Sequence, residues 1–187
     1  MKYLLFLFII FFTFSLNIYG QNEIYNIKNG ALLVRLQTNE HLIDYYSSKK
    51  MVKQANREQD KQNKLNEEII NTFKKEWSLC PVYFFYSTFS NEIQNNDFKN
   101  VFKDQKQPLS NQEKIKLKNN FLIAYIGDTP GSLKFNALVL TGNNFETLPR
   151  PFPKYVRTYK GLWFFKRKLN KSIQILEKKI NFQLSRI

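Results

Sequence analysis

The chain has 187 residues, of which 29 are Lys or Arg and 15 are Asp or Glu, so its formal net charge at pH 7 is +14. A single cysteine excludes an intramolecular disulfide, and a single histidine leaves few side chains for acid–base or metal chemistry near neutral pH. With only six glycines, a glycine-rich phosphate-binding loop is also disfavoured.

The first twenty residues have the three parts of an export signal. Lys2 supplies a short positive segment, residues 3–16 form an apolar core, and residues 17–20 are more polar and end in a small residue. We therefore predict cleavage before Gln21, with cleavage after Ser15 as the second choice. Export then places the protein in the periplasm or outside the cell.

The same segment has a second interpretation as an uncleaved anchor. The seventeen residues from Tyr3 to Tyr19 reach the length of roughly 17–25 residues that a membrane-spanning helix needs. If the signal is removed, residues 21–187 have the size of one globular domain, and we expect no membrane span in them.

A strand, a helical segment and a second strand are predicted next. Residues 31–36 and 82–86 are short apolar runs typical of buried strands. Between them a helical pattern, with a break near Ser47, continues to about residue 78, and Pro81 ends it. This order predicts a parallel strand pair joined by a helical crossover.

The helical segment changes character along its length. Thr38 or Asn39 is predicted to cap its start. Between residues 57 and 64 it has no apolar side chain, so we expect this part to project into solvent. Its second half has an apolar stripe that is expected to pack on the sheet, formed by Leu65, Ile69, Ile70, Phe73 and Trp77.

A β-hairpin is predicted after a polar loop with a short helix at residues 91–107. Residues 121–126 and 136–141 are apolar runs that flank a turn at residues 128–132, where Pro-Gly suits the centre of a type II turn. Both runs are apolar on successive residues, which indicates strands covered on both faces.

The last part of the chain is predicted to add an edge hairpin and a helix. Residues 154–159 and 162–165 read as strands, and Asn170 is the expected cap of a terminal helix. That helix has an apolar stripe at Ile173, Leu176, Ile180, Leu184 and Ile187. The predicted fold class is α/β (α+β), with a mixed sheet of about five to six strands, a long N-terminal helical segment and a C-terminal helix packed on it.

Few residues favour catalysis. The acidic residues beside His41 match no metal signature, and Cys80 is more typical of a buried apolar residue than of a nucleophile. Asp128 with Glu67 or Glu68 is a nominal carboxylate pair. No catalytic, cofactor-binding or metal-binding motif is found, so we expect a non-enzymatic protein without a cofactor, with an exported hydrolase that uses Cys80 or a carboxylate pair as the alternative.

The C-terminal region is the strongest candidate for binding. Residues 148–187 include eleven Lys or Arg and a single acid, Glu177. If residues 154–159 form a strand, alternate side chains share one face. The candidate binding residues are Arg150, Lys154, Tyr155, Arg157, Tyr159, Trp163, Lys166, Arg167 and Lys168. Alternatively, the charges only solvate an edge strand and the aromatic rings fill the core.

Aromatic rings interleaved with basic side chains suit a polyanionic partner. We therefore predict a small exported binding module whose partner is an anionic envelope surface, an acidic glycan or another exported protein, and we expect no specific nucleic acid. A scaffold that keeps residues 1–20 as an anchor is a further alternative.

Overall fold

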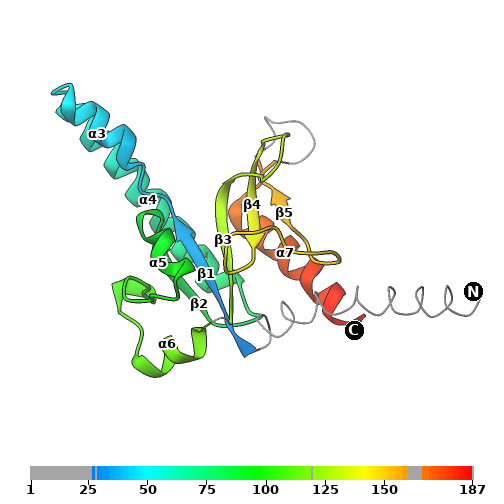
Figure 1. Ribbon diagram of the computed structural model, residues 1–187. Coiled ribbons are helices and arrows are strands. Elements are labelled where there is room, and N and C mark those ends of the chain that lie inside the picture. The colour runs from blue at the N-terminus through cyan, green and yellow to red at the C-terminus, as the bar shows by residue number, and fades with distance from the viewer. Residues whose placement is uncertain (1–26, 28, 119, 160–165, 187) are drawn as a thin grey trace, which may run out of the picture.

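The computed structural model of the chain describes residues 27, 29–118, 120–159 and 166–186 (Figure 1). Within them, five strands form one mixed sheet in the order β2-β1-β3-β4-β5. The strands are β1 (Ala31–Leu36), β2 (Val82–Tyr86), β3 (Phe121–Asp128), β4 (Asn136–Thr141) and β5 (Tyr155–Arg157). β1 pairs in parallel with β2 and β3, whereas β4 is antiparallel to β3 and β5. The mixed sheet, the parallel pair and the central hairpin are thus confirmed.

Helices lie on both faces of this sheet (Figure 1). The α-helices are α3 (Glu40–Ser48), α4 (Val52–Glu76), α5 (Ser90–Gln94), α6 (Asn111–Leu117) and α7 (Leu169–Leu184). Two short 3₁₀ turns are η1 (Ser87–Phe89) and η2 (Asp104–Lys106). The N-terminal helical segment and the C-terminal helix packed on the sheet agree with the predicted fold class.

The two faces have separate apolar cores because successive strand residues point to opposite sides. Leu32, Val34 and Leu36 of β1 pack in one core with residues of α4 and α7. Ala31 and Leu33 pack in the other core with residues of α5 and α6. The prediction that the central strands are covered on both faces is confirmed.

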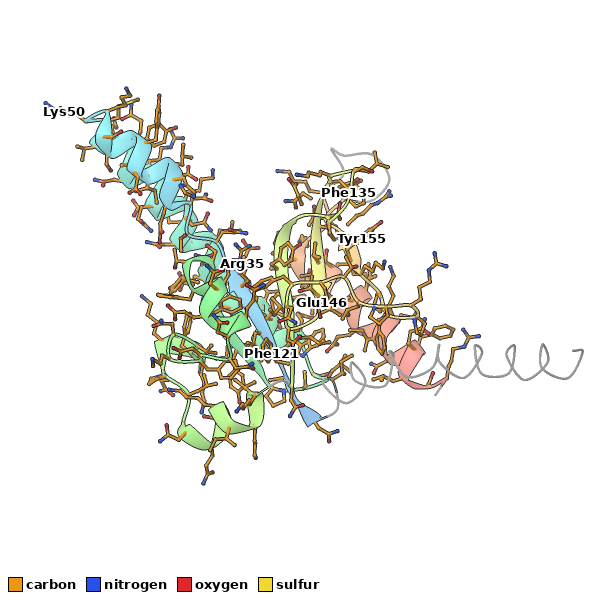
Figure 2. All side chains as sticks on the ribbon, viewed as in Figure 1. Arg35, Lys50, Phe121, Phe135, Glu146 and Tyr155 are labelled. Carbon is orange, nitrogen blue, oxygen red and sulfur yellow. The ribbon has the colours of Figure 1, made fainter. Side chains whose placement is uncertain are left out.

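The helical break predicted near Ser47 is a reversal of the chain. α3 ends at Ser48, Lys50 has a φ of 57°, and α4 then runs back along α3. The two helices form an arm that projects from the sheet with Lys50 at its tip (Figures 1 and 2). We call α3 and α4 up to Lys64 the helical arm.

Two details of the α4 prediction are wrong. Leu65 is 42 % exposed, whereas Gln62 and Asn66 are only 4 % and 5 % exposed. The reason is that α4 changes its neighbour at this level, from the apolar sheet to the polar end of β1. There the Asn66 side-chain amide donates a hydrogen bond to the backbone oxygen of Gln37, which an apolar side chain cannot do.

The predicted caps are only partly confirmed. Asn39 is at the N-cap of α3, but its side-chain amide donates to Glu58 of α4 instead of capping the helix. Asn170 does not cap α7, because the helix begins at Leu169. A capping box that was not predicted starts α6, where Ser110 and Glu113 bond each other's backbone N–H groups.

The loop between β3 and β4 depends on Thr129. Gly131 has the positive φ, 115°, that the second central position of a type II turn requires. The Thr129 hydroxyl donates to the backbone oxygen of Leu133 and accepts from the N–H of Phe135. This buried threonine therefore sets the position of Phe135, directly before β4.

Several sequence predictions lie outside the described residues. They are the export signal at residues 1–20, the turn at residues 160–161 and the strand at residues 162–165. Among the helices that are described, none combines the length and apolarity that crossing a membrane requires.

Replacing Phe73 with alanine tests the core beneath α4. Phe73 is fully buried and packs against Trp77 at a ring distance of 6.5 Å. We expect Phe73→Ala to lower the free energy of unfolding by about 3–5 kcal/mol, measured by urea denaturation. The control is Ile115→Ala on α6, where the side chain is 74 % exposed, and the expected change is below about 0.5 kcal/mol. Equal losses in both variants would contradict this account of the core.

Candidate functional site

The register of β4 and β5 decides which predicted binding residues share a face. Arg157 pairs with Ala137 and Tyr155 pairs with Val139. Paired residues point to the same side of a sheet, so Tyr155 and Arg157 lie on the α5 side, opposite α7. The predicted common face of these two residues is confirmed.

Phe135 joins this face and completes an aromatic cluster. The Arg157 guanidinium lies 4.7 Å from the centre of the Phe135 ring and 5.9 Å from that of Tyr159. Phe135 also meets Tyr155 edge to face, with ring centres 5.2 Å apart. Figure 2 shows Phe135 and Tyr155 together at one end of β4 and β5. We call Phe135, Tyr155, Arg157 and Tyr159 the Arg157 cluster.

Hydrogen bonds fold the following basic segment back onto β5. The N–H of Arg167 donates to the backbone oxygen of Thr158 at 2.7 Å, and its guanidinium donates to the backbone oxygen of Arg157 at 2.6 Å. Lys166 forms an antiparallel bridge with Tyr159. Arg167 and Lys166 are therefore anchored beside the Arg157 cluster.

The same face carries a second arginine farther along the sheet. The strand register aligns Arg35, Tyr125, Val139 and Tyr155 in one row across four strands. The Arg35 guanidinium donates to the Ser90 hydroxyl at 3.0 Å and is half buried, and burial lowers its pKa. Arg35 is thus engaged within the fold, whereas Arg157 is exposed and free to meet a ligand on its outer side.

The remaining predicted residues are not brought to this cluster. Lys154 precedes Tyr155 and by strand alternation belongs to the opposite face. Lys168 is the N-cap of α7. Arg150 is exposed in the loop before Pro151, which lines a hollow of about 520 Å³ against α7. Trp163 lies outside the described residues. The predicted set therefore divides, and only part of it forms one surface.

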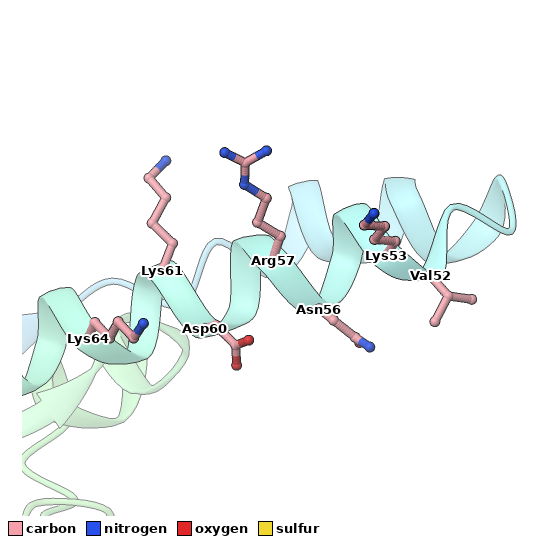
Figure 3. A pocket seen from close by; sticks show the side chains of 7 residues that line it. All are labelled: Val52, Lys53, Asn56, Arg57, Asp60, Lys61 and Lys64. Carbon is pink, nitrogen blue, oxygen red and sulfur yellow. The ribbon is translucent and has the colours of Figure 1, made fainter.

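A basic ridge on the helical arm was not predicted as a binding feature. Lys53, Arg57, Lys61 and Lys64 recur on one side of α4 (Figure 3). Asp60 lies in the same ridge, and Lys61 pairs with Glu58 at 3.4 Å. Positive charge is therefore spread over several surfaces. Arg186 also lies over the ring of Phe182, at 4.8 Å, whereas Arg157 lies over two rings.

The geometry does not favour the residues considered for catalysis. Burial raises the pKa of the Cys80 thiol to about 11, so the thiol stays protonated at neutral pH instead of forming a nucleophile. Cys80 also lies before β2, at the amino edge of the parallel strands, whereas sites in such sheets form at the carboxyl edge. His41 is exposed on α3, and the described residues contain no group of His, Cys, Asp and Glu side chains that could hold a metal ion.

The nominal carboxylate pair is not enclosed either. Asp128 is exposed at the end of β3, and Glu67 and Glu68 are exposed on α4. Catalytic pairs of this kind work in a cleft that excludes water. These three side chains stand in open solvent.

Comparison of the chain with protein-family models, with curated proteins and with solved structures finds no match. Sequence reasoning missed Phe135, because it precedes β4 and lies far from β5 in the chain. The sequence feature that could have identified Phe135 is its position one residue before β4, the strand that pairs with residues 155–157.

The raised pKa of Cys80 predicts a pH-dependent loss of stability. The folded chain holds the thiol proton more tightly than the unfolded chain, because burial raises the pKa from 9.0 to about 11. This contribution is fully present below pH 9.0 and is lost as the pH rises through about 11. In urea unfolding across this range, the wild-type chain should lose more stability than a Cys80→Ala variant. Parallel pH curves for the two chains would refute the assignment.

Proposed function

We propose that this protein is a non-enzymatic binding module that holds an anionic ligand on the Arg157 cluster. The carrying observation is the position of Arg157, which is exposed and is packed against Phe135 and Tyr159. Packing against rings restricts a long side chain before a ligand arrives, which reduces the entropy lost on binding. The guanidinium keeps N–H groups that can pair with an anion.

An acidic glycan is the ligand class that uses all parts of this cluster. A guanidinium donates two parallel hydrogen bonds to a carboxylate, and the rings of Tyr155 and Tyr159 offer apolar faces to a sugar. Lys166 and Arg167, anchored beside the cluster, add positive charge for the next acidic unit of a polymer. An anionic lipid surface or an acidic protein would use the charge but leave the ring faces unused.

Export is part of the same proposal. The sequence of residues 1–20 favours delivery to the periplasm or the cell exterior, where acidic polysaccharides are available as partners. The alternative of a signal-anchored envelope scaffold shares the binding surface and differs only in whether residues 1–20 stay on the chain.

Neutralising Arg157 tests the binding function. We expect the purified protein to bind polygalacturonate in a titration, more weakly as salt rises, and not to bind dextran. Arg157→Gln should weaken binding about tenfold or more, because a charge-assisted hydrogen bond is lost. Arg157→Lys should lie between the two, since it keeps the charge but not the planar group.

The matched control is Arg57→Gln, which removes the same charge from the basic ridge on α4. It should leave polygalacturonate binding within about twofold of wild type, because exposed charges farther apart than roughly 8 Å are largely screened at physiological salt. Equal losses for Arg57→Gln and Arg157→Gln would show that net charge, and not the cluster, holds the polymer. Binding to phosphatidylglycerol vesicles without binding to polygalacturonate would replace the glycan with a lipid surface.

The intact mass of the protein recovered from its natural host tests export. Removal of residues 1–20 predicts a chain that begins at Gln21, and the mass identifies that start directly. A mass that includes residues 1–20 in a membrane fraction would favour the anchored scaffold instead.

A further inference from the structure

The carboxyl edge of β1 and β2 has the geometry of a ligand crevice. β1 continues into α3 and α4 on one face of the sheet, and its neighbour β2 continues through η1 into α5 on the other face. Ligands of parallel sheets bind beyond the carboxyl ends of the strands, and this edge lies at those ends of β1 and β2. This position lies on the far side of β1 from the Arg157 cluster.

A hollow of about 330 Å³ occupies this position. The end of β1 contributes Thr38, and the end of β2 contributes Tyr86 and Thr88. α4 closes one side with carboxamide side chains, Gln62 and Asn66 among them. The volume is at the lower end of the range of about 300–1,000 Å³ that small-molecule sites have. We call this hollow the β1–β2 crevice.

Gln62 and Asn66 are the buried polar residues in the wall of the β1–β2 crevice. Both are more than nine-tenths buried, at positions where the apolar stripe of α4 would otherwise continue. Gln62 donates to the Asn66 side chain at 3.1 Å, and Asn66 donates to the backbone oxygen of Gln37 at 2.8 Å. Gln62 also lines the hollow, and its side chain has no fully buried polar atom that lacks a partner among the described residues.

Besides its bond to Asn66, the Gln62 carboxamide can therefore bond to water or to a ligand in the hollow. Asn66 is accounted for by the backbone it supports. The fold does not explain Gln62 in the same way, because a leucine at residue 62 would extend the apolar stripe of α4 without burying a polar group.

Hydrogen bonds hold the rim of the β1–β2 crevice in place without a ligand. The hydroxyls of Thr38 and Ser87 lie 3.1 Å apart and join the loops that follow β1 and β2. Ser90 donates to the backbone oxygen of Ser87 and accepts from Arg35. A rim connected in this way lowers the ordering cost of binding.

The charge of the lining restricts the ligand class. Glu40 is the one acidic residue among those that line the hollow, and the lining includes no Lys or Arg. An anionic ligand would therefore meet no positive partner there. The donors and acceptors are hydroxyls and carboxamides, which match neutral hydroxyl groups, and Tyr86 and Phe89 add aromatic surface.

We propose that the β1–β2 crevice binds a neutral sugar. The sugar is either a free monosaccharide or disaccharide or the uncharged end of a glycan chain. The Gln62 carboxamide donates to one sugar hydroxyl and accepts from its neighbour. Thr88 supplies a further hydroxyl from the end of β2. This site is separate from the Arg157 cluster and does not depend on it.

Calorimetric titration of the full chain tests this site. The probes are glucose, galactose, mannose, maltose and lactose, with glucose 6-phosphate and glucuronate as charged analogues. We expect one or more neutral sugars to bind and the charged analogues to bind more weakly. Gln62→Leu should weaken sugar binding about tenfold, the effect of one lost polar partner pair, and leave the melting temperature unchanged or higher.

Two further variants keep the result interpretable. Thr88→Val removes a hydroxyl from an exposed residue and should weaken sugar binding without affecting the fold. Gln54→Leu makes the same chemical change as Gln62→Leu at an exposed residue of α4 outside the crevice, so sugar binding should not change. If Gln62→Leu unfolds the chain, the effect of Thr88→Val on sugar binding tests the site instead.

The proposal is overturned if no neutral sugar binds, if the charged analogues bind better, or if Thr88→Val and Gln54→Leu affect binding alike. Maltohexaose distinguishes the two sources of ligand. Tighter binding than maltose indicates a glycan chain, and equal binding indicates a free sugar. Failure of sugar binding leaves polygalacturonate binding through Arg157 unaffected, so the two proposals are judged separately.

Discussion

The parallel pairing of β1 with both β2 and β3 is the constraint on which the rest of the structure depends. Because β1 is buried between two strands and covered on both faces, its side chains alternate between two apolar cores. A parallel neighbour on each side requires one helical connection to pass over each face. That requirement puts α4 on one face and α5 with α6 on the other.

The antiparallel half of the sheet serves a different purpose. β4 and β5 need no crossover, so one face of this half is left without a long helix and carries Tyr155 and Arg157 instead. Thr129 fixes the loop that delivers Phe135 to the same face. The protein therefore has two proposed binding surfaces of opposite character: an exposed cationic one at the sheet edge and a recessed one without Lys or Arg at the strand ends.

In the two proposals both surfaces bind saccharides, one a charged polymer and the other a single neutral unit. An acidic polymer contacts many surface residues and depends on charge, whereas a crevice lined by hydroxyls and carboxamides selects a single neutral unit. In both proposals the protein would recognise saccharides through contacts that involve neither the partly buried thiol of Cys80 nor the exposed His41.

The sequence by itself determined the five strands that the structure describes, the two-sided burial of the sheet and the helix pattern of α7, because apolar periodicity reports local structure directly. It also identified Tyr155, Arg157 and Tyr159 as residues of one face. Only the tertiary structure decided that Phe135 completes the cluster and that Gln62 and Asn66 are buried, since these facts depend on strand register and on what α4 meets beyond the end of β1. Polar residues carry no periodic signal of burial, so their partners became visible only in the fold.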